Sequence, residues 1–112
     1  WMLNGALKLW TGRPRPSTAA VTEVFGSSFP SGHAMGGTAL WVALALVCLA
    51  GCRSVPARRA VLAAAGVLLA LTALSRPVLG VHYFSDVLAG VAGGLAWTLW
   101  LARIWLPEQK LG

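Results

Sequence analysis

Long apolar stretches alternate with short polar ones along the chain. The apolar stretches occupy residues 31–50, 59–76 and 86–106. A helix rises about 1.5 Å per residue, so about 20 apolar residues cross the roughly 30 Å hydrocarbon core of a bilayer. We therefore predict an all-α fold, a transmembrane helical bundle with three spanning helices. The middle stretch is the shortest, and we expect Arg58 and Arg59 to snorkel at one end and Ser75 to extend the other.

The polar segments differ in length and composition. Residues 1–12 are mildly apolar but too short to span a bilayer, and we interpret them as the tail of a preceding helix. Residues 12–32 are rich in Pro, Ser, Thr and Gly, which is typical of a loop. Residues 51–59 form a short turn with three arginines and no acid. The chain begins on Trp1 without the features of a signal peptide, so we expect a piece of a longer protein.

The composition favours a membrane protein, because 57% of the 112 residues are hydrophobic and only 11% are charged. The net charge is +6. The cations are scattered between the apolar stretches and form no basic stripe, so we do not expect nucleic-acid binding. Lipid headgroups or an anionic substrate are the partners that fit such cations.

Small and aromatic residues add expectations about packing. Gly90 and Gly94 form a small-xxx-small pattern that favours close helix packing, although the whole stretch is rich in Gly and Ala. Cys48 and Cys52 are four apart, and no further Cys or nearby His completes a zinc ligand set. We interpret these cysteines as small core residues. An aromatic belt is expected near the far end of the third span, at Trp97, Trp100 and Trp105.

The orientation is predicted from the cations of the short loops. The turn 51–59 and the C-terminal end hold five Lys and Arg residues, and the opposite side holds four. Because the second group is suited to bind an anion, the arginine-rich turn is the better topogenic signal, and we expect it in the cytoplasm. The excess of Ala, Gly and Arg points to a bacterial source. The predicted location is the bacterial inner (plasma) membrane, with the site facing outward.

Polar and charged residues gather before the first span and between the second and third. Both connections emerge on the same face of a three-span bundle, so these residues should converge. They are Lys8, Arg15, Ser31, His33, Arg76, His82 and Asp86. Charged groups at a membrane edge are best explained by a charged ligand or by one another, and the donor geometry of arginine suits phosphate. We therefore predict an anion site.

Two local patterns within this set carry chemistry. Ser31 is a typical helix N-cap, Gly32 lets backbone N–H groups approach a phosphate, and His33 follows in the first turn. His82 and Asp86 are four apart, so a helix that begins here would place the carboxylate one turn from the imidazole. Such a carboxylate fixes the tautomer of a working histidine. A plain cap with an exposed histidine, and a helix-capping aspartate, are the alternatives.

These clusters match, in order, the three signature motifs of the type-2 phosphatidic acid phosphatase superfamily, which the chain resembles. That superfamily also includes vanadium haloperoxidases, bacterial acid phosphatases and glucose-6-phosphatase. Lys, six residues and then Arg-Pro is matched by KLWTGRPRP, residues 8–16. Pro-Ser-Gly-His is matched by residues 30–33. Ser-Arg, five residues, His, three residues and Asp is matched by SRPVLGVHYFSD, residues 75–86.

The resemblance implies a type-2 phosphatidic acid phosphatase domain over residues 1–112 that lacks its N-terminal spans, the C-terminal half of a six-span bundle. It implies an integral-membrane, metal-independent phosphatase without a cofactor that acts through a phosphohistidine. The substrate would be a lipid phosphate or an isoprenoid diphosphate, such as phosphatidic acid, phosphatidylglycerol phosphate or an undecaprenyl diphosphate. Missing N-terminal helices or a homo-oligomer would complete the bundle.

The same resemblance implies a role for each matched residue. His82 would be the nucleophile, Asp86 would hold its ring, and His33 would act first as general acid and then as base. The phosphoryl oxygens would be bound by Lys8, Arg15, Ser31, Gly32 and Arg76. The site holds a single acid, too few for a magnesium or two-metal centre.

Two alternative functions are kept. A vanadate-dependent haloperoxidase-like enzyme would use matching residues, although three apolar spans weigh against the larger soluble proteins of that class. An inactive truncated membrane module, which binds lipid phosphate or assembles with other helices, is the second. Phosphatase activity of the chain separates the second alternative from the main hypothesis.

Overall fold

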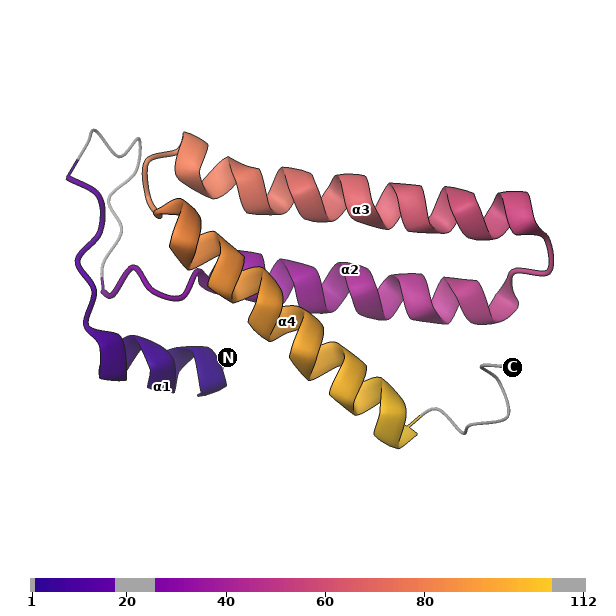
Figure 1. The fold of residues 1–112 in the computed structure, drawn as a ribbon, viewed down its shortest axis with the longest axis horizontal. Helices are drawn as coiled ribbons and strands as arrows, with labels where there is room; N and C mark the ends of the chain where they lie inside the picture. Colours follow the sequence, from indigo (N-terminus) through magenta and orange to yellow (C-terminus); the bar gives the residue numbers. More distant parts are fainter. Residues whose placement is uncertain (1, 18–25, 106–112) are drawn as a thin grey trace.

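The computed structural model describes residues 2–17 and 26–105, and this part of the chain is helical with connecting loops and without strands. The all-α prediction is therefore confirmed. Figure 1 shows the helices in order of the sequence. They are α1 (Met2–Thr11), α2 (Gly32–Gly51), α3 (Val55–Val78) and α4 (Phe84–Trp105).

Three of these helices, α2, α3 and α4, are long and apolar enough to cross a membrane, as the hydrophobic pattern predicts. The middle helix is longer at both ends than the predicted 59–76. It begins at Val55 because Ser54 caps it, with the hydroxyl accepting from the Ala57 amide at 3.3 Å, and a proline occupies the first turn. Arg59 therefore lies inside the helix rather than in the turn.

Helix α2 packs against both α3 and α4, and Figure 1 shows α2 and α3 running side by side while α4 crosses α2 at an angle. The crossing is close because two glycines of α4 face α2. A Cβ atom on Gly94 would lie 2.5 Å from the Met35 carbonyl oxygen, and one on Gly90 would lie 2.6 Å from that of Ser31. The small-xxx-small prediction is thus confirmed.

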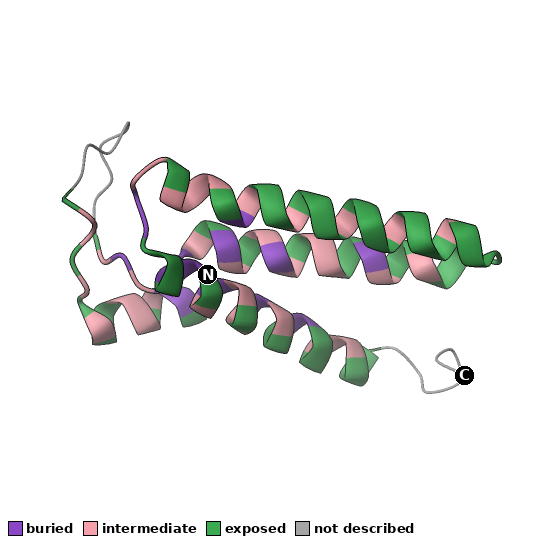
Figure 2. Ribbon diagram, turned by 45° about the horizontal axis from the view of Figure 1, so that its top comes forward, coloured by how far each residue is buried: buried purple, intermediate pink, exposed green. Residues whose placement is uncertain are grey.

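Burial is concentrated where α2, α3 and α4 meet near their polar end, and the outer faces of the helices are exposed (Figure 2). Ala34, Ala73 and Val87 form the buried apolar cluster. Large apolar side chains such as Leu71, 63% exposed, point outward. Such faces suit lipid, which is as apolar as the side chains themselves.

The interpretation of both cysteines as core residues is wrong for Cys48, which is exposed, while Cys52 is half-buried. Neighbouring helices cover only part of α2, and Cys48 lies on the uncovered part. The tryptophans expected to form a belt, Trp97 and Trp100, are about half exposed, and their ring centroids are 5.4 Å apart. Trp105, the last residue of α4, is 79% exposed.

Substitution of Gly94 by Ala tests the close crossing. The added methyl group must push α4 away from the backbone of α2, and we expect the unfolding free energy in detergent micelles to fall by about 1–3 kcal/mol. Gly66→Ala is the matched control, because nothing lies within 4 Å of its Cβ position. The control should leave stability unchanged or raise it by up to about 1 kcal/mol. Equal effects of the two substitutions would contradict the packing described.

Candidate active site

The polar end of the bundle is formed by α1, the segment that leads into α2, and the connection between α3 and α4, which Figure 1 shows at the same end of the molecule. The residues predicted to bind and transfer a phosphate come from these three parts. Arg15, His82 and Asp86 contact one another in sequence, and the backbone of Ser31 bonds to that of Asp86.

His82 lies in the connection between α3 and α4 and is only 6% exposed. Helix α4 begins at Phe84, so His82 precedes the helix, and the arrangement of His82 and Asp86 along one helix face does not occur. Its Nε2 atom is 3.4 Å from Nη1 of Arg15. Because a guanidinium can only donate, we assign Nε2 as the acceptor and place the ring proton on Nδ1.

The Nδ1 atom of His82 faces Asp86, with 3.6 Å between Nδ1 and Oδ2. This is longer than an ordinary hydrogen bond. No hydrogen bond of ordinary geometry reaches Nδ1 from any residue that the structure describes. The two groups are therefore adjacent without being tightly bonded, and the ring-holding role of Asp86 stays a prediction.

The carboxylate of Asp86 is completely buried and accepts several hydrogen bonds. The hydroxyl of Ser28 and the backbone amide of Tyr83, at 2.8 Å, donate to Oδ2. Nη1 of Arg13 donates to Oδ1 at 2.9 Å. Asp86 is the third residue of α4, and its bond to the Tyr83 amide is the reach-back contact of a helix N-terminus. A buried charge is tolerated when it is paired and hydrogen-bonded in this way.

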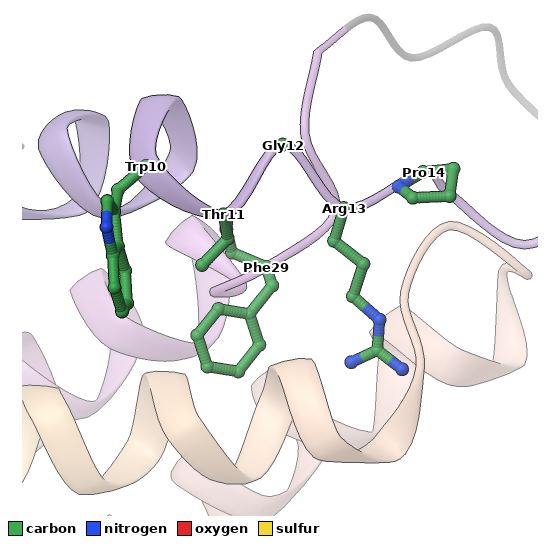
Figure 3. A pocket seen from close by; sticks show the side chains of 6 residues that line it. All are labelled: Trp10, Thr11, Gly12, Arg13, Pro14 and Phe29. Carbon is green, nitrogen blue, oxygen red and sulfur yellow. The ribbon is translucent and has the colours of Figure 1, made fainter.

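Arg13 was not assigned a role from the sequence, although it stands two residues before Arg15 in the first motif. Its guanidinium extends from the loop toward the start of α4 (Figure 3), where it also donates to Ser85 Oγ at 2.7 Å. It lies over the Tyr83 ring, 4.5 Å from the centroid. The open pocket beside it is lined by Trp10, Thr11, Gly12, Arg13, Pro14 and Phe29.

Ser28 was also missed. It is fully buried, and its backbone amide donates to the Arg13 carbonyl at 2.8 Å. Its place two residues before the Pro-Ser-Gly-His motif gave no signal of its own, because one serine in a loop rich in serine is ordinary. The fold, rather than the sequence, brings Ser28 against Asp86.

Helix α1 holds the segment before α2 through its polar face. Lys8 Nζ donates to the Ser27 carbonyl at 2.6 Å, and Thr11 Oγ1 donates to the Phe29 carbonyl at 3.0 Å. The buried Asn4 amide donates to the Pro30 carbonyl at 3.4 Å. The three donors are spaced i, i+4 and i+7, which places them on one face of a helix. Residues 27–30 are therefore fixed to α1 by their own backbone.

Ser31 begins α2 as predicted. Its side chain accepts from the Ala34 amide at 3.3 Å, and its amide donates to the Asp86 carbonyl at 3.0 Å. The residue is fully buried. Gly32 and His33 follow as the first residues of the helix, and His33 is exposed. The plain alternative of a serine cap with an exposed histidine thus describes this helix start in part.

The charges of Lys8 and Arg15 act on both histidines, and that of Arg76 acts on His33. Arg15 also donates to the carbonyls of Gly26, at 3.1 Å, and Val81, at 2.9 Å. Arg76, in the last turn of α3, donates to the hydroxyl of its neighbour Ser75 at 2.9 Å. The residues whose positive charges act on His33 are Arg76, Arg15 and Lys8. The structure thus brings the cations of the first and third motifs to the second.

The same surroundings change the protonation of two groups. Burial lowers the pKa of His82 below its usual 6.5, and the charges of Arg15 and Lys8 lower it further. The Ser28 backbone and the Asp86 carboxylate act in the opposite direction. Burial also lowers the pKa of Lys8, and Arg15 adds to this effect. His82 is therefore neutral near pH 7, as the assigned tautomer requires.

Titration of His82 by nitrogen-15 NMR in detergent micelles tests this electrostatic environment. We expect a pKa below that of an exposed histidine, and an Nδ1–H tautomer at neutral pH. Arg15→Gln removes a nearby positive charge, so it should raise the pKa of His82. Arg53→Gln, at the exposed far end of the bundle, should leave it unchanged. A pKa that does not respond to Arg15→Gln would contradict the contact between the two side chains.

A metal site is not evident in this part of the chain. Among the described residues, no three His, Cys, Asp or Glu side chains are grouped so that they could hold a metal ion. Cys48 and Cys52 are both free. The polar side chains at the polar end are cationic or neutral apart from the Asp86 carboxylate, and the cationic and neutral donors among them suit an anion.

Comparison with known proteins agrees with the geometry. The chain is 36% identical over 98 residues to phosphatidylglycerophosphatase B of Bacillus subtilis (strain 168), an alignment that covers 84% of this chain and 47% of that protein. A crystal structure of a transmembrane PAP2 type phosphatidylglycerolphosphate phosphatase from Bacillus subtilis matches with a TM-score of 0.82 at 33% identity, over 92% of this chain and 52% of the other. The chain spans about half the length of these relatives.

These matches, together with the three apolar helices, make the chain part of a multi-pass membrane protein. The profile of the PAP2 superfamily matches residues 1–110, nearly the whole of the sequence. The family resemblance carried by the three motifs is therefore confirmed, and the chain belongs to the PAP2 superfamily.

Proposed function

We propose that the protein is a membrane phosphatase that hydrolyses a lipid phosphate through a phosphohistidine on His82. The observation that carries the proposal is the environment of this side chain. A buried, neutral imidazole turns its Nε2 lone pair toward Arg15 and its Nδ1–H toward a buried carboxylate. A nucleophile beside a cation that binds phosphate is the arrangement that phosphoryl transfer needs.

The phosphoryl group is proposed to bind between Lys8, Arg15 and Arg76, at the start of α2. One of the three N–H groups of Lys8 donates to the Ser27 carbonyl, and the other two can donate to a ligand. The Ser31 hydroxyl accepts a bond from the Ala34 amide and retains its own proton to donate. The amide of Gly32 adds the positive end of the helix dipole.

In the first chemical step, Nε2 of His82 attacks phosphorus and the bond from phosphorus to the ester oxygen breaks. His33 protonates the leaving oxygen, so that an alcohol is released, and His82 carries the phosphoryl group. The ring becomes positively charged, and the Asp86 carboxylate behind Nδ1 stabilises that charge. The cations around the phosphate stabilise the transition state by holding its equatorial oxygens.

In the second step, His33 accepts a proton from a water molecule that attacks phosphorus. The bond between phosphorus and Nε2 breaks, and inorganic phosphate leaves. We propose that no metal ion takes part, since Lys8, Arg15 and Arg76 supply the positive charge that a metal would otherwise bring.

Phosphatidylglycerol phosphate is the substrate that we favour, because both similar proteins are named for its hydrolysis. Phosphatidic acid and isoprenoid diphosphates carry the same phosphate group and are the competing substrates. We further propose that the site faces outward from a bacterial plasma membrane. The exposed Arg53, Arg58 and Arg59 at the opposite end would then lie in the cytoplasm.

Phosphate release from phosphatidylglycerol phosphate in detergent micelles, with EDTA present, tests the nucleophile and the absence of a metal. His82→Ala should lower the rate by about 10⁴-fold or more and abolish acid-labile phosphate on the protein. Turnover that survives in the variant would exclude His82 as nucleophile. Folded wild-type protein that releases no phosphate would instead favour the membrane-module alternative, in which these helices need others to act.

His33→Ala should lower the rate on the lipid substrate by about 10²- to 10⁴-fold while KM stays nearly constant. With p-nitrophenyl phosphate, whose leaving group needs no proton, the first step should survive and the second should fail. The expected time course is a burst of nitrophenol followed by slow turnover. Phosphohistidine should accumulate over the same period. Absence of a burst, or an equal loss on both substrates, would contradict the assigned acid and base roles.

A further inference from the structure

The Asp86 carboxylate is fixed by side chains that belong to none of the predicted catalytic positions. Arg13 donates to Oδ1 at 2.9 Å, and the buried Ser28 hydroxyl donates to Oδ2. They approach from different segments, the loop after α1 and the segment before α2. A fully buried carboxylate is held in its position by such donors.

Arg13 contacts the carboxylate of the pair rather than the imidazole. Its Nη1 atom is committed to Ser85 and Asp86, and its guanidinium plane lies over the Tyr83 ring. Arg15, in contrast, contacts Nε2, the atom that would attack phosphorus. One loop thus places two arginines on opposite sides of the catalytic pair, one at the nucleophile and one at the carboxylate.

We infer that Arg13 and Ser28 are positioning residues, which act on His82 through Asp86 by holding the carboxylate behind Nδ1 and by limiting how strongly it attracts the ring proton. This inference rests on the proposed phosphatase function. It names residues that act without touching the substrate, and it separates the roles of the two arginines in the first motif.

The direction of the electrostatic effect follows from the charges that face His82. Lys8 from α1 and Arg15 from the following loop disfavour the protonated ring, and Asp86 from α4 favours it. Arg13 neutralises part of the Asp86 charge. Without Arg13 the carboxylate attracts the proton more strongly, so the pKa of His82 rises and a larger fraction of the nucleophile is protonated at a given pH.

The test compares Arg13→Gln, Arg13→Lys and Ser28→Ala with two matched controls. Arg58→Gln removes an exposed arginine at the far end, and Ser27→Ala removes the neighbouring hydroxyl, which donates to the Phe29 carbonyl at 3.3 Å. For each protein, kcat and KM on phosphatidylglycerol phosphate, the acid limb of the pH profile and inhibition by inorganic phosphate are measured.

Arg13→Gln should lower kcat by about 10- to 100-fold, the loss of one charged hydrogen bond, with KM and phosphate inhibition within about twofold of wild type. Its acid limb should move to higher pH. Ser28→Ala should move the limb in the same direction, and Arg13→Lys, which keeps the charge, should restore its position. A raised KM with weaker phosphate inhibition and an unmoved limb would make Arg13 a phosphate ligand and overturn the inference. Unchanged kinetics in all three variants would overturn it as well.

NMR titration of His82 measures the effect of Arg13 on the pKa of His82 without requiring turnover. The pKa of His82 should rise in Arg13→Gln and stay constant in Arg58→Gln. If the wild-type protein releases no phosphate, the proposed function fails while the titration still decides whether Arg13 acts on His82. Suppose instead that the enzyme is active and that His82→Ala is inactive. If the pKa of His82 is then the same in Arg13→Gln and in Arg58→Gln, the positioning role alone is excluded.

Discussion

The need to satisfy one buried charge organises the polar end of this molecule. The carboxylate of Asp86 is shielded from solvent, so its free energy depends on donors that the protein itself must supply. Those donors are Arg13, Ser28 and the backbone of Tyr83, and the Asp86 carbonyl in turn accepts from the Ser31 amide. The first, second and third motifs are distant in sequence, and each contributes to this one cluster. Loss of the carboxylate would therefore loosen the whole site, besides removing a partner of the imidazole.

The membrane-spanning part supports this cluster by bringing two helix starts together. The glycines of α4 let its backbone contact that of α2. The start of α2, which carries His33, therefore lies beside the start of α4, which carries Asp86. Small residues allow such an approach in a bilayer, where no hydrophobic force draws helices together. Exposure of the outer faces then imposes no penalty, because lipid surrounds them. Packing and catalytic geometry are thus determined at the same contact.

The sequence predicted the spans, and it predicted that Arg15, His82 and Asp86 lie together, because both features leave strong local patterns. Apolar runs of membrane length identify α2, α3 and α4, and motif spacing identifies residues such as His82 and Asp86. Arg13 and Ser28 escaped prediction because their contacts are with a residue more than 50 positions away in the sequence. The start of α3 was misplaced because a charged turn and a capped helix start look alike when arginines follow the cap. The exposure of Cys48 depends on which side of α2 the neighbouring helices cover. The sequence of a largely apolar helix has no hydrophobic periodicity that would reveal this side.

The contact between α1 and the segment before α2 affects which residues of that segment can be replaced during evolution. Asn4, Lys8 and Thr11 each donate to a main-chain oxygen of residues 27–30. Every amino acid carries the same carbonyl group, so the anchoring itself imposes no particular side chain on that segment. Ser28 stays constrained by its own hydroxyl bond to Asp86, whereas its neighbours in the segment can change without loss of the main-chain bonds from α1. The segment and its support are in this way encoded by separate stretches of the gene.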